Sequence, residues 1–151
     1  SRHLLETIKS RTLEIKIILK EKRRIEIINN LTKSFNLELI LDPNKSKLSP
    51  GNFIKFNYLC CEHDISLEKD FMENLSFLLN LYKKNKDILL INLIFFLTDY
   101  YFNDLYKSNK IKKNKIYEIK NFIFDNLNNF LLYNINQTSL LNALNNKLNY
   151  E

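Results

Sequence analysis

The sequence predicts a mainly α-helical protein, and three observations lead to this class. The 151 residues include only one glycine, Gly51, and two prolines, Pro43 and Pro50, which are residues that tight turns and β-hairpins prefer. Hydrophobic residues make up 45% of the chain, which is enough for a core. Over most of the length they recur at three- and four-residue spacing, which is typical of amphipathic helices. We therefore expect packed helices, with one short strand near the start.

That strand is predicted for residues 13–17, where apolar and polar side chains alternate. Ser10 and Arg11 come just before it, so the arginine would lie where a loop enters a sheet. A lone strand cannot satisfy its own edges and needs partner strands. Either it pairs with a poorly patterned segment of this chain, or the rest of its sheet lies outside the chain.

A small helical unit is predicted for residues 19–63. The basic segment "KEKRRIEIINNLTKSF" has an apolar stripe formed by Ile25, Ile28, Leu31 and Phe35. A break follows at Asp42 and Pro43. Ser49 is a good N-cap for a second helix, and Pro50 suits the first helical position because a proline needs no hydrogen-bond partner there.

Four longer helices are predicted for residues 64–151. The first is capped by Ser66, and the second, "DILLINLIFFLTDYYFNDLY", is so apolar that we expect it to be central and buried. The other two have these apolar stripes: Ile116, Ile119, Phe122, Ile123, Leu127, Phe130 and Leu131, then Leu140, Leu141, Leu144 and Leu148. Long helices joined by short loops predict an antiparallel bundle.

Composition limits the location of the protein. The cysteines Cys60 and Cys61 are adjacent and do not form a disulfide framework, which fits a reducing compartment. The longest apolar run, residues 88–97, is half of the ~20 residues that a membrane-spanning helix needs. The pattern of a cleavable leader peptide is not seen. We expect a cytoplasmic protein without membrane contact.

The cluster "CCEHD", residues 60–64, could suggest a metal site or a cysteine–histidine pair with His63. Adjacent cysteines chelate poorly, and His3 is the only other histidine. We expect a helix end with partly buried thiols instead. A single glycine also excludes a glycine-rich phosphate loop, so the chain cannot hold a nucleotide by that route.

Charged side chains offer weaker signals. The carboxylate pairs Glu68/Asp70 and Asp99/Asp104 are expected on solvated helix surfaces rather than in acid–base catalysis. The net charge is +6, and basic side chains gather in residues 20–24 and 110–115. These could contact phosphates electrostatically and without sequence preference.

Three segments together resemble bacterial clamp-loader subunits of the AAA+ family. "LLETIKSRTLEIKI" resembles the end of the AAA+ core and matches at Leu4, Leu5, Thr7, Ile8, Ser10 and Arg11, with Thr12 where the family carries cysteine. "LSPG", which contains Ser49, Pro50 and Gly51, resembles the "GSPG" that opens a lid helix in delta-prime-type subunits of DNA polymerase III, with Leu48 in place of the first glycine. "NINQTSLLNALNNKL" resembles their final collar helix. The nucleotide-binding front of the AAA+ core is absent.

The resemblance implies the tail of an AAA+ core in residues 1–18, a helical lid in 19–63 and a helical collar for oligomerisation in 64–151. Arg11 would be an arginine finger that reaches the ATP of a neighbouring subunit in trans. ATP and magnesium would then belong to that neighbour, and this chain would hold no cofactor. The expected partners are the gamma/tau and delta subunits and, through the assembly, the sliding clamp and primer–template DNA. The chain would be part of a polymerase holoenzyme without being catalytic by itself.

Two alternatives remain. One is a fragment of a gamma/tau-type motor subunit, and the other is a free-standing basic helical module that binds nucleic acid.

Overall fold

The computed structural model describes residues 19–108 and 113–149. In these ranges the chain forms six α-helices and one short 3-10 helix, and no strand. The elements are α2 (Glu21–Ser34), η1 (Pro43–Lys45), α3 (Pro50–Glu62), α4 (Phe71–Asn85), α5 (Ile88–Ser108), α6 (Lys113–Tyr133) and α7 (Gln137–Asn149). The predicted mainly helical class is confirmed. The strand expected at residues 13–17 lies outside the described ranges and stays a prediction.

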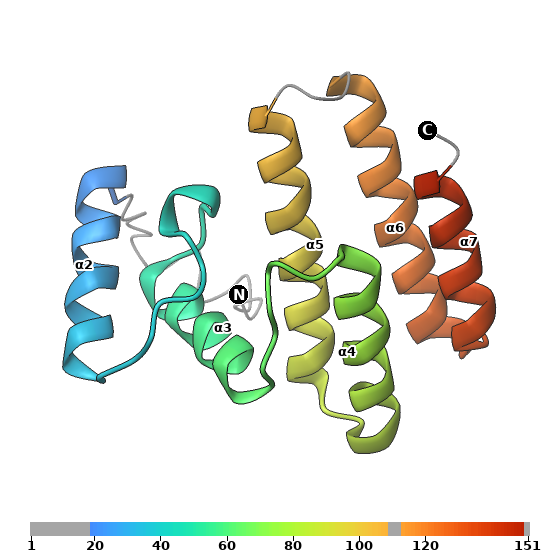
Figure 1. Ribbon diagram of the computed structural model, residues 1–151, viewed down its shortest axis with the longest axis horizontal. Coiled ribbons are helices and arrows are strands. Elements are labelled where there is room, and N and C mark those ends of the chain that lie inside the picture. The colour runs from blue at the N-terminus through green and yellow to red at the C-terminus, as the bar shows by residue number, and fades with distance from the viewer. Residues whose placement is uncertain (1–18, 109–112, 150–151) are drawn as a thin grey trace, which may run out of the picture.

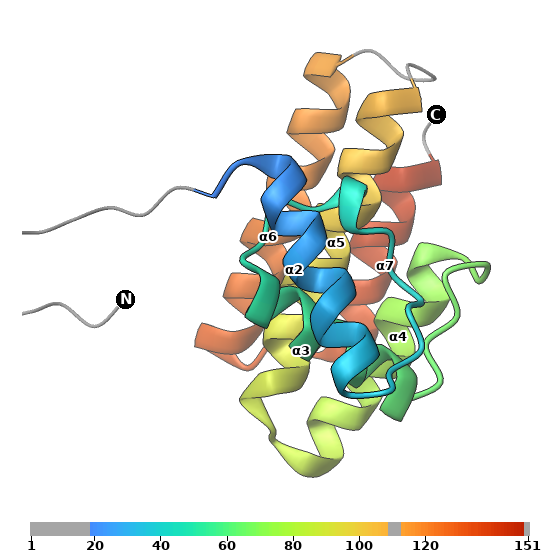
Figure 2. The ribbon, with the colours of Figure 1, turned by 90° about the vertical axis from the view of Figure 1, so that its left-hand side faces the viewer.

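Helices α4 to α7 run alternately up and down and form the predicted bundle (Figure 1). Helix α5 packs against α4 and α6, and α7 packs against α6 and α4. Helices α2 and α3 form a pair that covers one side of this bundle (Figure 2). The pair meets the bundle through α3 and η1, which both contact α5.

One hydrophobic core extends through both parts. Every helix contributes at least one side chain that is nearly or completely inaccessible to solvent: Ile28 on α2, Phe53 on α3, Leu79 on α4, Leu93 on α5, Ile123 on α6 and Leu144 on α7. Phe56 of α3 stacks on Phe96 of α5 with 4.7 Å between ring centroids. The boundary predicted near residue 63 therefore crosses a continuous core.

Helix α5 is the most apolar element of the fold. Its segment Ile88–Lys107 is long and apolar enough to cross a membrane by length and composition, and half of that segment is buried inside the protein. Because α3, α4 and α6 all pack against α5, its composition is that of a central core helix, as the sequence predicts.

The predicted start of α4 and the predicted place of Phe35 in an apolar stripe are wrong. Helix α4 begins at Phe71 instead of after Ser66, because the Asp70 carboxylate accepts a hydrogen bond of 3.0 Å from the Met72 N–H and caps the helix. Ser66 instead accepts a hydrogen bond from Glu68 N–H in the preceding turn. Helix α2 ends at Ser34 with Phe35 as its C-cap, one residue from the predicted end, but Phe35 is 64% exposed and does not extend the predicted apolar stripe.

Candidate functional site

The serine–arginine motif lies outside the described ranges. Ser10, Arg11 and Thr12 belong to residues 1–18, so the predicted arginine finger stays a prediction. The described part of the chain holds the second matched segment, the lysine-rich segments in part, the cysteine cluster and the predicted carboxylate pairs.

Ser49, Pro50 and Gly51 start a helix, as predicted. Ser49 is the N-cap of α3, and its carbonyl accepts a 2.9 Å hydrogen bond from Phe53 N–H, although its hydroxyl makes no capping bond. Pro50 is buried at the first helical position. No neighbouring atom lies within 4 Å of the place where a Cβ would be on Gly51. Packing within the described residues therefore does not require a glycine there.

The basic run at residues 20–24 is only partly available to a polyanion. Arg24 is 5% exposed, and its guanidinium donates hydrogen bonds of 2.6 Å to the Pro43 carbonyl and 3.3 Å to the Leu48 carbonyl. It also forms an ion pair with Glu21 at 2.6 Å. Arg24 thus lies one turn before Ile28 on the buried face of α2, although it was not part of the predicted stripe, and it joins α2 to the chain before α3. Two carbonyls and a carboxylate of the fold therefore occupy its guanidinium.

The second basic segment, residues 110–115, is described only from Lys113 onward. Lys113 lies over the ring of Tyr106 with 4.8 Å from its Nζ to the ring centroid. Tyr106 is 47% exposed, so an aromatic side chain does accompany a lysine here.

The cysteine cluster is the predicted helix end with partly buried thiols. Cys60 is completely buried on α3, and burial raises the pKa of its thiol to about 12. Cys61 is half-buried and donates to the Glu38 carbonyl at 3.6 Å, and burial also raises its pKa. Thiols with raised pKa values are poor nucleophiles and poor metal ligands. Helix α3 ends at Glu62, and His63 is its C-cap.

The carboxylates of α5 do more than face solvent. Asp99 accepts a hydrogen bond from Asn103 and forms an ion pair with Lys120, which joins α5 to α6. Asp104 forms an ion pair with Lys45 at 2.8 Å, which joins α5 to η1. Both carboxylates are about half exposed on the surface of α5, as expected, and each also forms an ion pair with a lysine from another element.

Three polar contacts attach η1 and its N-cap to α5. They are the Asp42 N–H donating to Tyr100 Oη at 2.8 Å, the ion pair of Lys45 with Asp104, and Lys107 Nζ donating to the Asn44 carbonyl at 2.6 Å. The hydrogen bond to Asp104 raises the pKa of Lys45. Burial raises the pKa of Tyr100. We call these contacts the η1–α5 junction.

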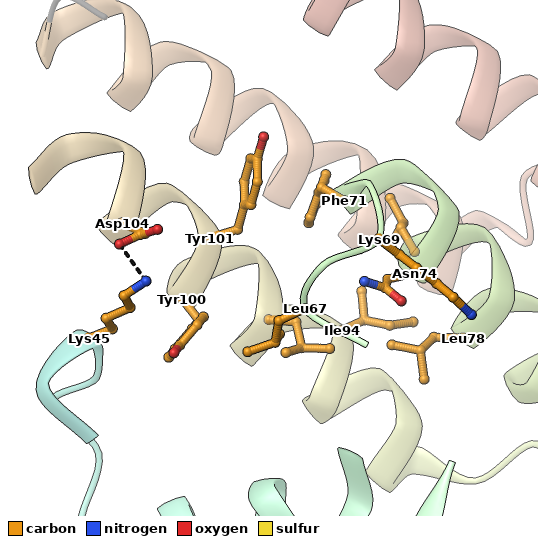
Figure 3. A pocket seen from close by; sticks show the side chains of 12 residues that line it. Lys45, Leu67, Lys69, Phe71, Asn74, Leu78, Ile94, Tyr100, Tyr101 and Asp104 are labelled. Carbon is orange, nitrogen blue, oxygen red and sulfur yellow. Dashed lines mark ion pairs between the residues drawn. The ribbon is translucent and has the colours of Figure 1, made fainter. Parts of the chain in front are cut away.

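A pocket of about 170 Å³ adjoins the junction. Its apolar walls come from α4, α5 and the turn before α4, and include Leu67, Leu78 and Ile94. Figure 3 shows Lys45 and Asp104 at one end and Lys69 with Asn74 at the other, with Tyr100 and Leu67 in between. The pocket therefore combines an apolar middle with charged ends.

Sequence reasoning did not find this pocket. The spacing of Tyr100 and Asp104 does place both on one face of a helix, because residues four apart are neighbours there. Nothing near them in the sequence indicates Lys45, which comes from a different element. Comparisons of the chain with protein-family models, with curated proteins and with solved structures find no match.

Proposed function

We propose that this chain is the lid and collar portion of a delta-prime-type clamp-loader subunit of bacterial DNA polymerase III, with Arg11 as an arginine finger in trans. The observation that carries the proposal is the order of three matched segments. The first contains Ser10 and Arg11, the second contains Ser49 to Gly51, and the third is the last helix. They occur in the sequence in the order in which the family has its core end, lid and collar.

The helical architecture supports the proposal. Helix α3 begins at Pro50, and a two-helix unit precedes a four-helix bundle. A collar must also present apolar surface to its neighbours. Leu132 and Tyr133 at the end of α6 are 75% and 73% exposed, and Ile135 in the following turn is 36% exposed. Large apolar side chains that gather on a surface are typical of protein contacts.

The proposed role of Arg11 follows from guanidinium chemistry. A guanidinium presents a rigid fork of donors that matches two phosphate oxygens, and it stays charged at any relevant pH. Arginine fingers in other nucleotide hydrolases contribute about 10³ to 10⁵ in rate, whereas an exposed ion pair contributes under ~1 kcal/mol. ATP and magnesium would be held by the neighbouring gamma/tau subunit. This chain would position the arginine and assemble through its collar.

The test is ATP hydrolysis by the reconstituted clamp loader with primer–template DNA. Arg11→Ala in the full-length subunit should lower turnover by at least about 10³-fold at unchanged subunit assembly. Arg11→Lys should also fail to restore ATP turnover, because an ammonium group lacks the fork of donors that a guanidinium presents. The matched control is Arg23→Ala, since Arg23 is an exposed arginine whose ion pair within the described residues is with Glu26 of its own helix. Unchanged turnover in Arg11→Ala would remove the finger role.

The upstream gene sequence separates the proposal from a gamma/tau-type motor subunit. A motor subunit must carry an intact phosphate loop before the segment that contains Arg11. A delta-prime-type subunit does not depend on one.

A basic nucleic-acid-binding module is the second candidate, and the lysine beside an exposed ring at Lys113 and Tyr106 favours it. Such a module would bind DNA in isolation with a steep dependence on salt. Failure of the isolated chain to bind DNA at low salt would exclude this candidate.

A further inference from the structure

The pocket beside the η1–α5 junction has the composition of a binding site for a small molecule. Its volume of about 170 Å³ is similar to that of an engineered cavity of about 150 Å³ that binds benzene. Leu67, Leu78 and Ile94 line its middle, and the rings of Phe71 and Tyr101, which stack with 4.9 Å between their centroids, line one side. This lining favours a compact aromatic or branched aliphatic group.

The polar ends of the pocket are rich in hydrogen-bond donors. Asp104 is the only carboxylate in the lining, and the 2.8 Å ion pair with Lys45 occupies it. Tyr100 Oη accepts from Asp42 N–H, so its own O–H remains able to donate. Lys69 forms no ion pair with any side chain in the described ranges. A ligand that supplies acceptor oxygens and a negative charge complements this set.

We propose that the pocket binds a small carboxylate with a compact apolar body, such as an arylcarboxylate or a branched aliphatic carboxylate. The apolar body would lie against Leu67, Leu78 and Ile94, and the carboxylate would pair with Lys69. Lys45, at the opposite end of the pocket, would stay in its ion pair with Asp104. This binding role goes beyond the proposed clamp-loader function and is tested without it.

The test uses the 151-residue chain labelled at its methyl groups and titrated with benzoate, benzyl alcohol and benzylamine. These probes share an aromatic ring and differ in charge. We expect benzoate to shift the methyl signals of Leu78 and Ile94 in a saturable manner, about fivefold more tightly than benzyl alcohol, which is the size of one partly exposed ion pair. Benzylamine should bind more weakly than either. Benzoate should also raise the melting temperature.

Two variants locate the site. Lys69→Ala should reduce benzoate affinity to that of benzyl alcohol, whereas Lys84→Ala, an exposed lysine later on α4, should leave it unchanged. Leu67→Trp should fill the pocket and abolish binding of both probes, and because Leu67 is 39% exposed in a turn, the helical content should stay the same by circular dichroism. The proposal is overturned if no probe shifts these methyl signals, if benzylamine binds as well as benzoate, or if neither Lys69→Ala nor Leu67→Trp changes benzoate affinity.

Discussion

The guanidinium of Arg24 donates a 2.6 Å hydrogen bond to the carbonyl oxygen of Pro43, and this contact joins α2 to η1. The Arg24 side chain is buried, and the Leu48 carbonyl and the Glu21 carboxylate complete its set of partners. A buried cation of this kind stabilises a fold only while every partner is in place. The arginine therefore determines how the first helix of the α2–α3 pair sits on the chain before α3.

Arg24→Ala should lower the free energy of unfolding by about 2–4 kcal/mol, because the hydrogen bonds that the guanidinium donates to the Pro43 and Leu48 carbonyls are lost. Urea unfolding followed by circular dichroism measures the loss. Arg23→Ala is the matched control, since its ion pair with Glu26 is exposed and should cost under about 0.5 kcal/mol. Equal shifts in the two variants would show that burial of Arg24 contributes nothing.

Asn57 determines the path of the segment between α2 and η1. It is fully buried, its Oδ1 accepts from Ile40 N–H and Leu41 N–H at 2.9 and 3.0 Å, and its Nδ2 donates to the Glu38 carbonyl at 2.6 Å. Asn57→Ala leaves the Ile40 and Leu41 N–H groups without their acceptor and removes one of the two donors to the Glu38 carbonyl, so we expect a loss of about 2–4 kcal/mol in urea unfolding.

Asn52→Ala is the control for Asn57, because Asn52 is exposed on the same helix and should change stability by less than about 0.5 kcal/mol. The stability of Asn57→Asp should lie between the stabilities of Asn57→Ala and Asn52→Ala, since the acceptor oxygen remains while the N–H donor is lost. A stable Asn57→Ala variant would contradict this account.

Tyr100→Phe removes the hydroxyl that accepts from Asp42 N–H and keeps the buried ring. We expect the free energy of unfolding to fall by about 1 kcal/mol. Hydrogen exchange at the Asp42 amide should accelerate relative to the unsubstituted protein, and by more than at other amides of the fold. Hydrogen exchange followed by NMR measures both effects. Tyr106→Phe, at a 47% exposed tyrosine, should change neither. Unchanged exchange at Asp42 in Tyr100→Phe would refute a structural role for the η1–α5 junction.

The two thiols should differ in reactivity. In the native protein at pH 8, an aromatic disulfide reagent should modify Cys61 slowly and Cys60 only when the protein opens, because Cys60 is completely buried. In the Cys61→Ser variant, the remaining thiol should react only in denaturant. Rapid modification of that variant under native conditions would contradict the burial of Cys60.

The raised pKa of Cys60 also predicts how stability depends on pH. The pKa rises from about 9 in the unfolded chain to about 12 in the fold, so the folded state disfavours the thiolate. The stability that the protonated, buried thiol contributes is fully present below pH 9. It is lost as the pH rises toward 12, by at most about 1.4 kcal/mol for each pH unit. Urea unfolding between pH 8 and 10.5 measures the loss, and Cys60→Ala should show a smaller decline over the same range.

Sequence periodicity was sufficient to predict that the described residues form helices, and it identified most of the buried face of α6. The stripe predicted for α6 includes Ile116, Ile119, Ile123, Leu127 and Phe130, and all five are buried. Ser49 and Pro50 likewise predicted the start of α3, because capping preferences depend only on residues near the helix end. These features are local, so neighbouring residues carry the whole signal.

Only the tertiary structure determined the polar connections and the pocket. Arg24 donates to the carbonyl of a residue 19 positions away. Asn57 accepts from N–H groups 16 and 17 positions away, and Tyr100 accepts from an N–H group 58 positions away. A periodic pattern indicates which face of a helix is buried, but it does not say what lies opposite that face. Arg24 looked like part of a solvated basic run, and its burial depends on carbonyls that only folding brings within reach. The pocket exists for the same reason, since its lysines come from η1 and the turn before α4 and meet the tyrosines and the carboxylate of α5 only in three dimensions.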